Sequence, residues 1–425
     1  MGTLIDVGSF IKLQRTKQGI TQGELAGGIV SLSYLSKIEN NKTDASPEIL
    51  QMLCSRLGIQ LSSEEDPSIQ EKCQNWFDML YEANDKSEII ATYEELQEIM
   101  DKNLSENLLL FEIHKIRYYL ILGEVDKALE KINELNELSS AFEGIQKFYW
   151  YKFRGNFNSI NGEFNQALRL YRLADEKIKN LELPEDQIAD LQYTLAVTHS
   201  KLRNTLEVID HAERALEIYM KEYNFMRCAQ CHIVLGISYR RIKMYEKAIK
   251  NYNLARHLGE LNKDNHVIQL TNLNLGYLYS ALSESNEAIK FFTEVVEDEE
   301  VLLYERLAAT TSLVKEYYKV GNYEKAQSVI QKALYLLKDT QGEAQYKLFH
   351  YITYTYIYAI NDQRKDFISL VTDKFIPYLQ KHKDYANLVV YSNMLAEYLE
   401  KLGKYKESVK YYKLSNVTYE ELINL

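Results

Sequence analysis

A repeat of about 40 residues is the feature of this 425-residue sequence that most restricts its fold. A small side chain recurs at the same place in successive copies, at intervals of 39, 41, 40, 40, 38 and 82 residues. The positions are Ala128, Ala167, Val208, Ala248, Ala288, Ala326 and Ser408. A period of this length indicates a helical array in which each unit buries its apolar face against its neighbours. The last interval predicts one degenerate copy around Asp366.

The two clearest copies resemble the tetratricopeptide repeat. One contains Leu275, Gly276, Tyr279, Ala288 and Phe292, and the other contains Leu235, Gly236, Tyr239, Ala248, Tyr252 and Ala255. The resemblance implies pairs of helices stacked into a right-handed superhelix, with an aromatic ring of the second helix filling the gap beside a small residue of the first. We expect about eight pairs over residues 105–425, with helices longer than in the usual repeat because the period exceeds 34.

The segment 21–43 predicts two short helices joined by a tight turn. Thr21 and Glu24 have the spacing of a capping box, and Ser31 is a second N-cap. The second helix directs Leu32, Leu35 and Ile38 inward and leaves a short polar outer face of Ser33, Tyr34, Lys37 and Asn40. A helix-turn-helix needs this arrangement, because the exposed side chains of its second helix meet base edges in the major groove.

The flanking sequence completes a small helical domain. Residues 5–18 predict a preceding helix that ends at Gly19, and Ser46 and Pro47 begin a following helix that closes at Gly58. Residues 62–68 are polar and contain proline, as linkers do. We therefore expect an all-α chain with a helix-turn-helix domain at 1–61, a linker and connecting helices at 62–104, and the repeats at 105–425.

The charge distribution allows a nucleic acid partner only near the N-terminus. The whole chain has a formal charge of −11, but residues 1–60 carry six Lys and Arg against five Asp and Glu. Their net charge is thus +1 and the remainder carries −12. Because this excess is slight, one copy should bind DNA weakly, and a homodimer or higher homo-oligomer that reads two half-sites is the expected functional unit.

Composition argues against several other classes of protein. No stretch approaches the about 20 apolar residues of a membrane span, and the N-terminus lacks a signal-peptide pattern, so we expect a cytoplasmic protein with no membrane partner. The four cysteines do not suggest a disulfide framework in a chain this long. Cys228, Cys231 and His232 lack a second ligand pair at suitable spacing, so no metal or cofactor is expected. No phosphate loop, HExxH or GxSxG motif is present, which argues against an enzyme.

The N-terminal motif resembles the XRE/Cro type of helix-turn-helix. The matching residues are the run from Thr21 to Ala26, the run from Ser31 to Asn40, and the Pro-led helix that ends at Leu57-Gly58-Ile59. The inter-helix segment is one residue shorter than usual, as in peptide-regulated activators of Firmicutes. We expect Thr21, Gln22 and Lys42 to meet phosphate, Ser33, Tyr34 and Lys37 to reach base edges, and Asn40 or Asn41 to meet the backbone. Glu39 is expected to pair with Arg15 within the domain.

The repeat register predicts which side chains line the concave surface of the repeats. The inner positions of the first helices are Arg117, Asn156, Tyr193, Lys201, Arg240, Arg241, Asn274, Tyr277, Ser280, Lys315, Tyr318 and Asn393. An Asn amide both donates and accepts, so Asn274 suits the main chain of an extended peptide. Arg240 and Arg241 suit a carboxylate. For each single residue, a solvated helix face or an internal contact remains the competing interpretation.

Together the two parts resemble the Gram-positive quorum-sensing receptors Rap, Rgg, NprR, PlcR, PrgX and AimR, and the length is closest to NprR. The resemblance implies a transcription regulator that binds operator DNA and a short signalling oligopeptide, with the peptide changing how protomers associate. It also implies a Rap-like interaction with a response regulator of a sporulation phosphorelay. Two alternatives stay open: repeats that bind a protein in place of a peptide, and a Rap-like phosphatase-stimulating activity.

Replacement of Lys37 by Ala tests its expected role on the second helix of the motif. If Lys37 reads a base, the loss should be roughly 1–3 kcal/mol at one base pair of the operator and absent on non-specific DNA. Binding to a panel of single-base operator variants measures this difference. An equal loss on all sequences would assign Lys37 to phosphate instead.

Overall fold

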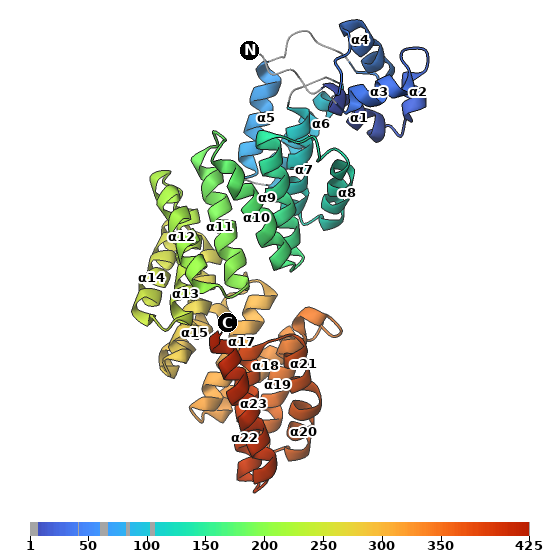
Figure 1. Cartoon of the computed structure of the whole chain (residues 1–425). Helices are drawn as coiled ribbons and strands as arrows, with labels where there is room; N and C mark the ends of the chain where they lie inside the picture. Colours follow the sequence, from blue (N-terminus) through green and yellow to red (C-terminus); the bar gives the residue numbers. More distant parts are fainter. Residues whose placement is uncertain (1–6, 41, 60–66, 82–85, 103–106, 425) are drawn as a thin grey trace. The chain divides into compact units, whose positions relative to one another are not determined.

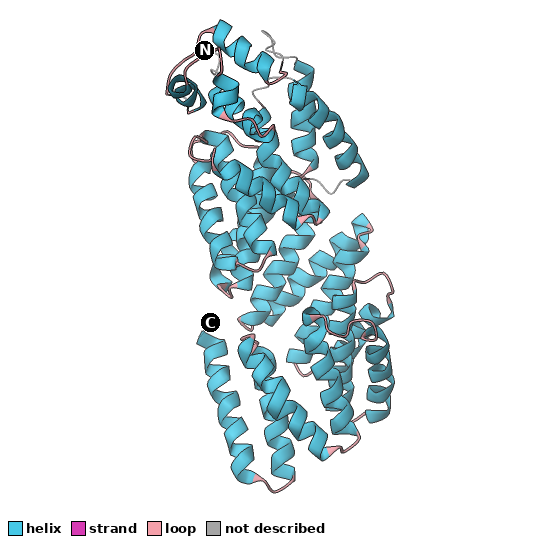
Figure 2. Ribbon diagram, turned by 90° about the vertical axis from the view of Figure 1, so that its right-hand side faces the viewer, coloured by secondary structure: helices cyan, strands magenta, loops and turns pink. Residues whose placement is uncertain are grey.

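The structure is a computed structural model that describes residues 7–40, 42–59, 67–81, 86–102 and 107–424. In these residues the chain is helical throughout and contains no strand (Figure 1). The helices are joined by short loops and turns, as the colouring by secondary structure makes clear (Figure 2). The all-α fold expected from the sequence is therefore confirmed.

The N-terminal helices form the small domain expected from the sequence, which we call the reader. Its helices are α1 (Val7–Lys17), α2 (Gln22–Ala26), α3 (Leu32–Glu39) and α4 (Pro47–Arg56). Thr21 and Glu24 form the predicted capping box, and Ser31 and Ser46 accept the backbone N–H groups of Tyr34 and Ile49. These caps satisfy N–H groups that have no partner inside a helix, so they define where each helix begins.

Two connecting helices and eight helix pairs make up the rest of the described chain. The connecting helices are α5 (Pro67–Met79) and α6 (Lys86–Lys102). In chain order the first four pairs are α7 (Leu108–Leu122) with α8 (Val125–Asn136), α9 (Gly144–Ile160) with α10 (Phe164–Ile178), α11 (Glu185–Lys201) followed by α12 (Thr205–Lys221), and α13 (Phe225–Arg241) with α14 (Tyr245–Asn262). The third is a pair in sequence only, because the boundary between the two compact units falls between α11 and α12. The next two are α15 (Asn265–Ala281) with α16 (Ser285–Glu297), and α17 (Leu303–Lys319) with α18 (Tyr323–Leu336).

The seventh pair is the degenerate copy predicted around Asp366. The short 3₁₀ helix η1 (Ala344–Tyr346) precedes α19 (Lys347–Ile360). The second helix of the pair is interrupted, because the π-helical segment η2 (Leu370–Phe375) separates α20 (Arg364–Ser369) from α21 (Ile376–Lys381). Pro377 stands at the start of α21 and supplies no N–H to the preceding turn. The last pair, α22 (Tyr385–Lys401) and α23 (Tyr405–Asn424), is regular again.

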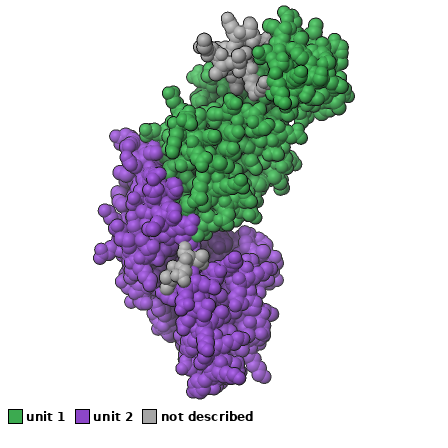
Figure 3. Space-filling model, in the orientation of Figure 1, with its two compact units in different colours: residues 1–202 green, residues 203–425 purple. Residues whose placement is uncertain are grey.

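The described chain divides into two compact units, residues 1–202 and 203–425 (Figure 3). The first unit holds the reader, the connecting helices and the repeats up to α11. The second unit holds the helices from α12 onward. The two units are defined by compactness, and their boundary lies inside the repeats. The domain boundaries expected from the sequence, after residues 61 and 104, therefore remain a prediction.

Each clear repeat is closed by an aromatic ring that lies over a glycine. A Cβ added at Gly155 would lie 2.5 Å from a ring carbon of Tyr171, and one at Gly276 would lie 2.5 Å from a ring carbon of Phe292. Gly236 meets Tyr252 in the same way. The recurring small residues Ala128, Ala167, Val208, Ala248, Ala288, Ala326 and Ser408 are all buried. The sequence pattern thus corresponds to close contact between the two helices of a pair.

Several features bear on the classes of protein considered above. No helix in the described part of the chain is long and apolar enough to cross a membrane. All four cysteines are buried with free thiols, and burial raises the pKa of Cys54 and Cys228 to about 11. Within the described residues, no group of three His, Cys, Asp or Glu side chains could hold a metal ion.

Replacement of Gly276 by Ala tests the ring contact. The new methyl group would meet Phe292 inside a packed pair, so the variant should lose about 1–3 kcal/mol of unfolding free energy. Chemical denaturation followed by circular dichroism measures the loss. Gly23→Ala is the matched control, because the nearest atoms to its Cβ are 3.9 Å away and a helix favours Ala. Equal stability of both variants would contradict the proposed packing.

Candidate DNA and ligand interfaces

The second helix of the motif, α3, is held in place by a buried carboxylate. Arg15 Nε lies 2.6 Å from Glu39 Oε1, and its Nη2 donates to Oε2 at 3.0 Å. Gln22 Nε2 also donates to Oε2, at 2.7 Å. The expected pairing of Arg15 with Glu39 is confirmed. Because the three side chains come from α1, α2 and α3, this network fixes the orientation of α3 within the reader.

The eight residues expected at DNA differ in how free they are to reach it. Ser33, Lys37 and Lys42 are exposed. Tyr34 donates its hydroxyl to the carbonyl of Asp44, and the Asn40 side chain donates to the carbonyl of Ser36. Thr21 is engaged in the capping box, Gln22 donates to Glu39, and Asn41 lies outside the described residues. Lys37 and Lys42 are thus the exposed cations of this set, and all eight assignments stay predictions.

All twelve residues expected to line the repeats lie on first helices of pairs, but those in the first unit are mainly engaged internally. Arg117 donates to the carbonyl of Leu80 at 2.9 Å and to Asp190 Oδ2 at 3.3 Å. Its guanidinium also lies over the ring of Tyr81. Asn156 accepts the hydroxyl of Tyr171. Tyr193 is half-buried and Lys201 is exposed. We therefore leave Arg117 out of the proposed ligand set.

In the second unit, α13 presents a concentration of positive charge. Burial and the guanidinium groups of Arg203 and Arg240 lower the pKa of Arg241 to about 10. Arg240 lies over the ring of Tyr277 on α15, 5.9 Å from its centroid. The Arg240 Nε is buried and has no hydrogen-bond partner among the described residues. A buried N–H without an acceptor is costly, so a carboxylate ligand would stabilise this arrangement.

The next inner helix, α15, contributes an amide and an aromatic ring. One N–H of the Asn274 amide donates to the carbonyl of Leu270, which leaves its second N–H and its oxygen for a ligand. Asn274 is only 6% exposed, so the amide is reached from one side. The ring of Tyr277 packs edge-on against Phe292, which is the ring that covers Gly276. Tyr277, one of the residues expected to meet a ligand, is therefore in contact with the ring that closes the repeat.

On α17, the structure adds a residue that sequence reasoning missed. Glu316 is buried and accepts the Ser280 hydroxyl at one carboxylate oxygen. The other oxygen, Oε2, is buried without a hydrogen-bond partner among the described residues. Burial lowers the pKa of the neighbouring Lys315, and the charge of Glu316 opposes that change. The helical register placed Lys315 inward, and a wider inner stripe would have included Glu316 as well.

The first helices of the pairs from α17 onward share a row of aromatic rings, Tyr318, Tyr356 and Tyr391. Tyr318 packs edge-on against Tyr356 of α19, and Tyr356 in turn contacts Tyr391 of α22. Burial raises the pKa of Tyr318, and Asn393 is half-buried on the same helix as Tyr391. In chain order, α13 thus carries cations, α15 an amide, α17 a carboxylate, and α17, α19 and α22 aromatic rings.

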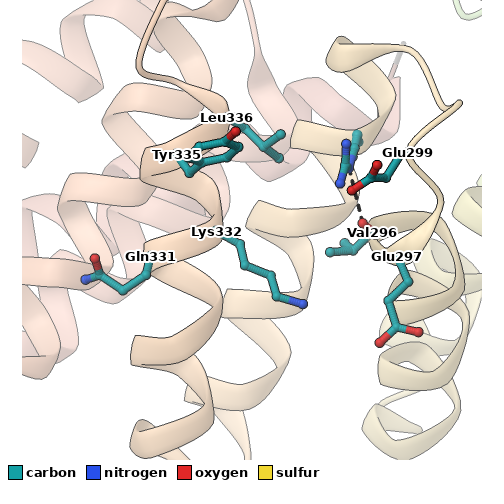
Figure 4. Close-up of a pocket in the computed structure, with 8 residues that line it drawn as sticks. Val296, Glu297, Glu299, Gln331, Lys332, Tyr335 and Leu336 are labelled. Atoms are coloured by element: carbon teal, nitrogen blue, oxygen red, sulfur yellow. Dashed lines mark hydrogen bonds between the residues drawn. The ribbon is translucent and has the colours of Figure 1, made fainter.

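A separate pocket of about 510 Å³ opens between α16, α17 and α18 (Figure 4). Arg306 donates to the carbonyl of Val296 at one wall, and Lys332, Tyr335 and Leu336 of α18 form another. None of the twelve predicted ligand residues lines it. The pocket is therefore distinct from the inner helix face.

Comparisons with known proteins match two parts of the chain to different families. A helix-turn-helix family model matches residues 11–63, and the model of the soluble NSF attachment protein family matches residues 151–319. The transcriptional activator NprA of Geobacillus stearothermophilus is 34% identical over 408 residues, which cover 94% of this chain and 100% of NprA. The chain belongs to the NprA family of regulators. The resemblance to peptide-regulated quorum-sensing regulators is thereby confirmed.

Solved structures show the same fold at lower identity. The apo form of the quorum sensor NprR from B. thuringiensis superposes with a TM-score of 0.70 at 20% identity, covering 83% of this chain and 99% of that one. NprR in complex with its cognate peptide NprX gives a TM-score of 0.61 at 20% identity, covering 85% of this chain and 100% of that one.

Replacement of Glu39 by Ala tests the network that holds α3. The substitution leaves Arg15 and Gln22 without their shared acceptor, so the reader should lose roughly 3–5 kcal/mol of stability. Hydrogen exchange of the α3 amides measures this local loss. Asp44→Ala removes the same charge from an exposed position and should leave exchange near the native rate. Unchanged protection in Glu39→Ala would contradict the role given to the network.

Proposed function

We propose that this protein regulates transcription by binding operator DNA through the reader and a short signalling oligopeptide along the inner helices of its second unit. The observation that carries the proposal is that Arg240 Nε and Glu316 Oε2 are both buried and neither has a hydrogen-bond partner among the residues that the structure describes. They lie on inner helices of one compact unit, with the Asn274 amide on the helix between them. Membership of the NprA family supports the regulatory role.

An extended peptide matches the chemistry of this helix face. Arg240 would receive a carboxylate, Glu316 would accept an ammonium group or an N–H, and Asn274 would bond the peptide main chain in both directions. The aromatic row from Tyr318 onward would cover apolar side chains. The NprR structure that shares this fold contains a cognate peptide, which supports the choice of ligand class.

The reader requires a second copy for tight DNA binding. Its charge of +1 supplies little attraction to phosphate, and a helix-turn-helix dimer gains affinity by reading two half-sites. We propose that the peptide binds one arrangement of the repeats better than another and so changes how two protomers associate. Regulation then follows from whether two readers fit one operator.

The direct test is fluorescence anisotropy of labelled DNA from the region upstream of the gene, titrated with the full chain. The ligand probe is the low-mass peptide fraction of spent medium from the host. The proposal predicts that the fraction changes DNA affinity or stoichiometry. Identical DNA binding with and without it would contradict the proposal and favour a protein partner, such as a response regulator, for the repeats.

Arg240→Ala and Asn274→Ala test the ligand residues in the same assay. Each substitution removes one expected bond to the peptide, so more of the peptide fraction should be needed for a half-maximal change in DNA binding. The increase should be about 10- to 100-fold for Arg240→Ala, which removes a charged group, and smaller for Asn274→Ala, which removes a neutral one. DNA binding without peptide should stay at the native level. Lys250→Ala, an exposed charge on α14, is the matched control. A native response in all three variants would place the ligand elsewhere.

A further inference from the structure

The reader and the first repeat helix meet at a buried carboxylate. Glu112 of α7 is fully buried and accepts hydrogen bonds from three lysines. Lys17, the last residue of α1, lies 2.5 Å from Oε1, and Lys115 of α7 lies 2.8 Å from the same oxygen. Lys131 of α8 donates to Oε2 at 2.7 Å. Two of these lysines belong to the repeats, and Lys17 belongs to the reader.

Glu112 has two cationic partners in the repeats besides Lys17 of the reader. Burial alone would raise the pKa of Glu112, but the three lysines hold it well below its usual range. Lys131 has a second partner in Glu134, and Lys17 lies 4.0 Å from Asp101. Without Lys17, the pair of repeat lysines still compensates Glu112. The buried Glu112 carboxylate is thus paired with two lysines of the repeats and, in addition, with Lys17 of the reader.

The contact reaches the DNA-reading helix through α1. Lys17 is two residues after Arg15, and Arg15 holds Glu39 of α3. On the other side, α7 also carries Arg117, whose partner Asp190 lies on α11 and also pairs with Lys152 of α9 at 3.0 Å. Ion pairs thus connect α3 with α1, α1 with α7, and α7 with α9 and α11, all inside the first unit.

We propose that the Lys17–Glu112 ion pair is a latch that fixes the reader to the first repeat helix. With the latch closed, α3 keeps one orientation relative to α7, and any movement of α7 is carried to α3. With the latch open, the reader loses this ion pair with α7 and the coupling is lost. The role of the latch in DNA binding rests on the proposed function, whereas the latch itself does not.

The latch is tested by the distance between reader and repeats, measured by double electron–electron resonance on the full chain. Spin labels are placed at Gln51→Cys on α4 and Glu130→Cys on α8, both exposed, while the native cysteines are buried. Lys17→Gln should widen the distance distribution about twofold, because the reader gains local freedom. Lys17→Arg, which keeps the charge, should restore the native width.

Lys12→Gln is the control, because it removes the same charge from the same helix away from Glu112. Circular dichroism should show native helix content in both Gln variants. A Lys17→Gln distribution as narrow as that of wild type, or equal widening in Lys12→Gln, would overturn the latch. Glu112 itself is kept, because its removal would leave the buried Lys115 without its carboxylate partner and Lys131 with Glu134 alone.

A second readout separates the latch from the proposed function. In the DNA titration, Lys17→Gln should bind upstream DNA yet lose at least half of the response to the peptide fraction, and Lys12→Gln should retain that response. If wild type binds no DNA while Lys17→Gln still widens the distance distribution, the latch stands and the proposed function fails. If wild type responds to peptide and Lys17→Gln responds equally, the coupling role is overturned.

Discussion

The close approach of an aromatic ring to a glycine is the contact on which the repeat domain depends. Tyr171, Tyr252 and Phe292 each cover the glycine of the preceding helix so tightly that no Cβ would fit. The second helix of each such pair packs against the glycine face of the first helix. Polar side chains of the first helix lie on its other faces. Asn274 and Tyr277 flank Gly276, so the packing contact and the proposed ligand residues belong to the same two turns of α15.

Both units bury charged side chains. In the first unit, Glu112 pairs with Lys115 and Lys131, and Asp190 pairs with Arg117 and Lys152, so these pairs tie neighbouring helices together. In the second, Arg240 and Glu316 each keep a buried polar atom without a partner among the described residues. Buried polar groups are normally paired because leaving them unpaired costs free energy. The atoms of Arg240 and Glu316 therefore suit the ligand site that we propose for the second unit.

The helices and their repeat could be predicted from the sequence because both are encoded by residues close together in the chain. The repeat period, the small buried residues and the caps at Thr21, Ser31 and Ser46 all depend on neighbours a few positions away. The Arg15–Glu39 pair was also predicted, since both ends lie in one small domain. The partners of Arg117 and the inward position of Glu316 were not, because they depend on helices 36 or more residues apart packing at one angle.

The central claim is that one chain couples a peptide site to a DNA site, and thermodynamic linkage tests it most directly. The full chain would be incubated with the low-mass peptide fraction, with and without upstream DNA, and the retained peptide measured by native mass spectrometry. Coupled binding sites change each other's affinity by the same factor. We predict that DNA changes the affinity for the retained peptide by a certain factor, and that the peptide changes the affinity for DNA by the same factor. Peptide retention that is indifferent to DNA would contradict it.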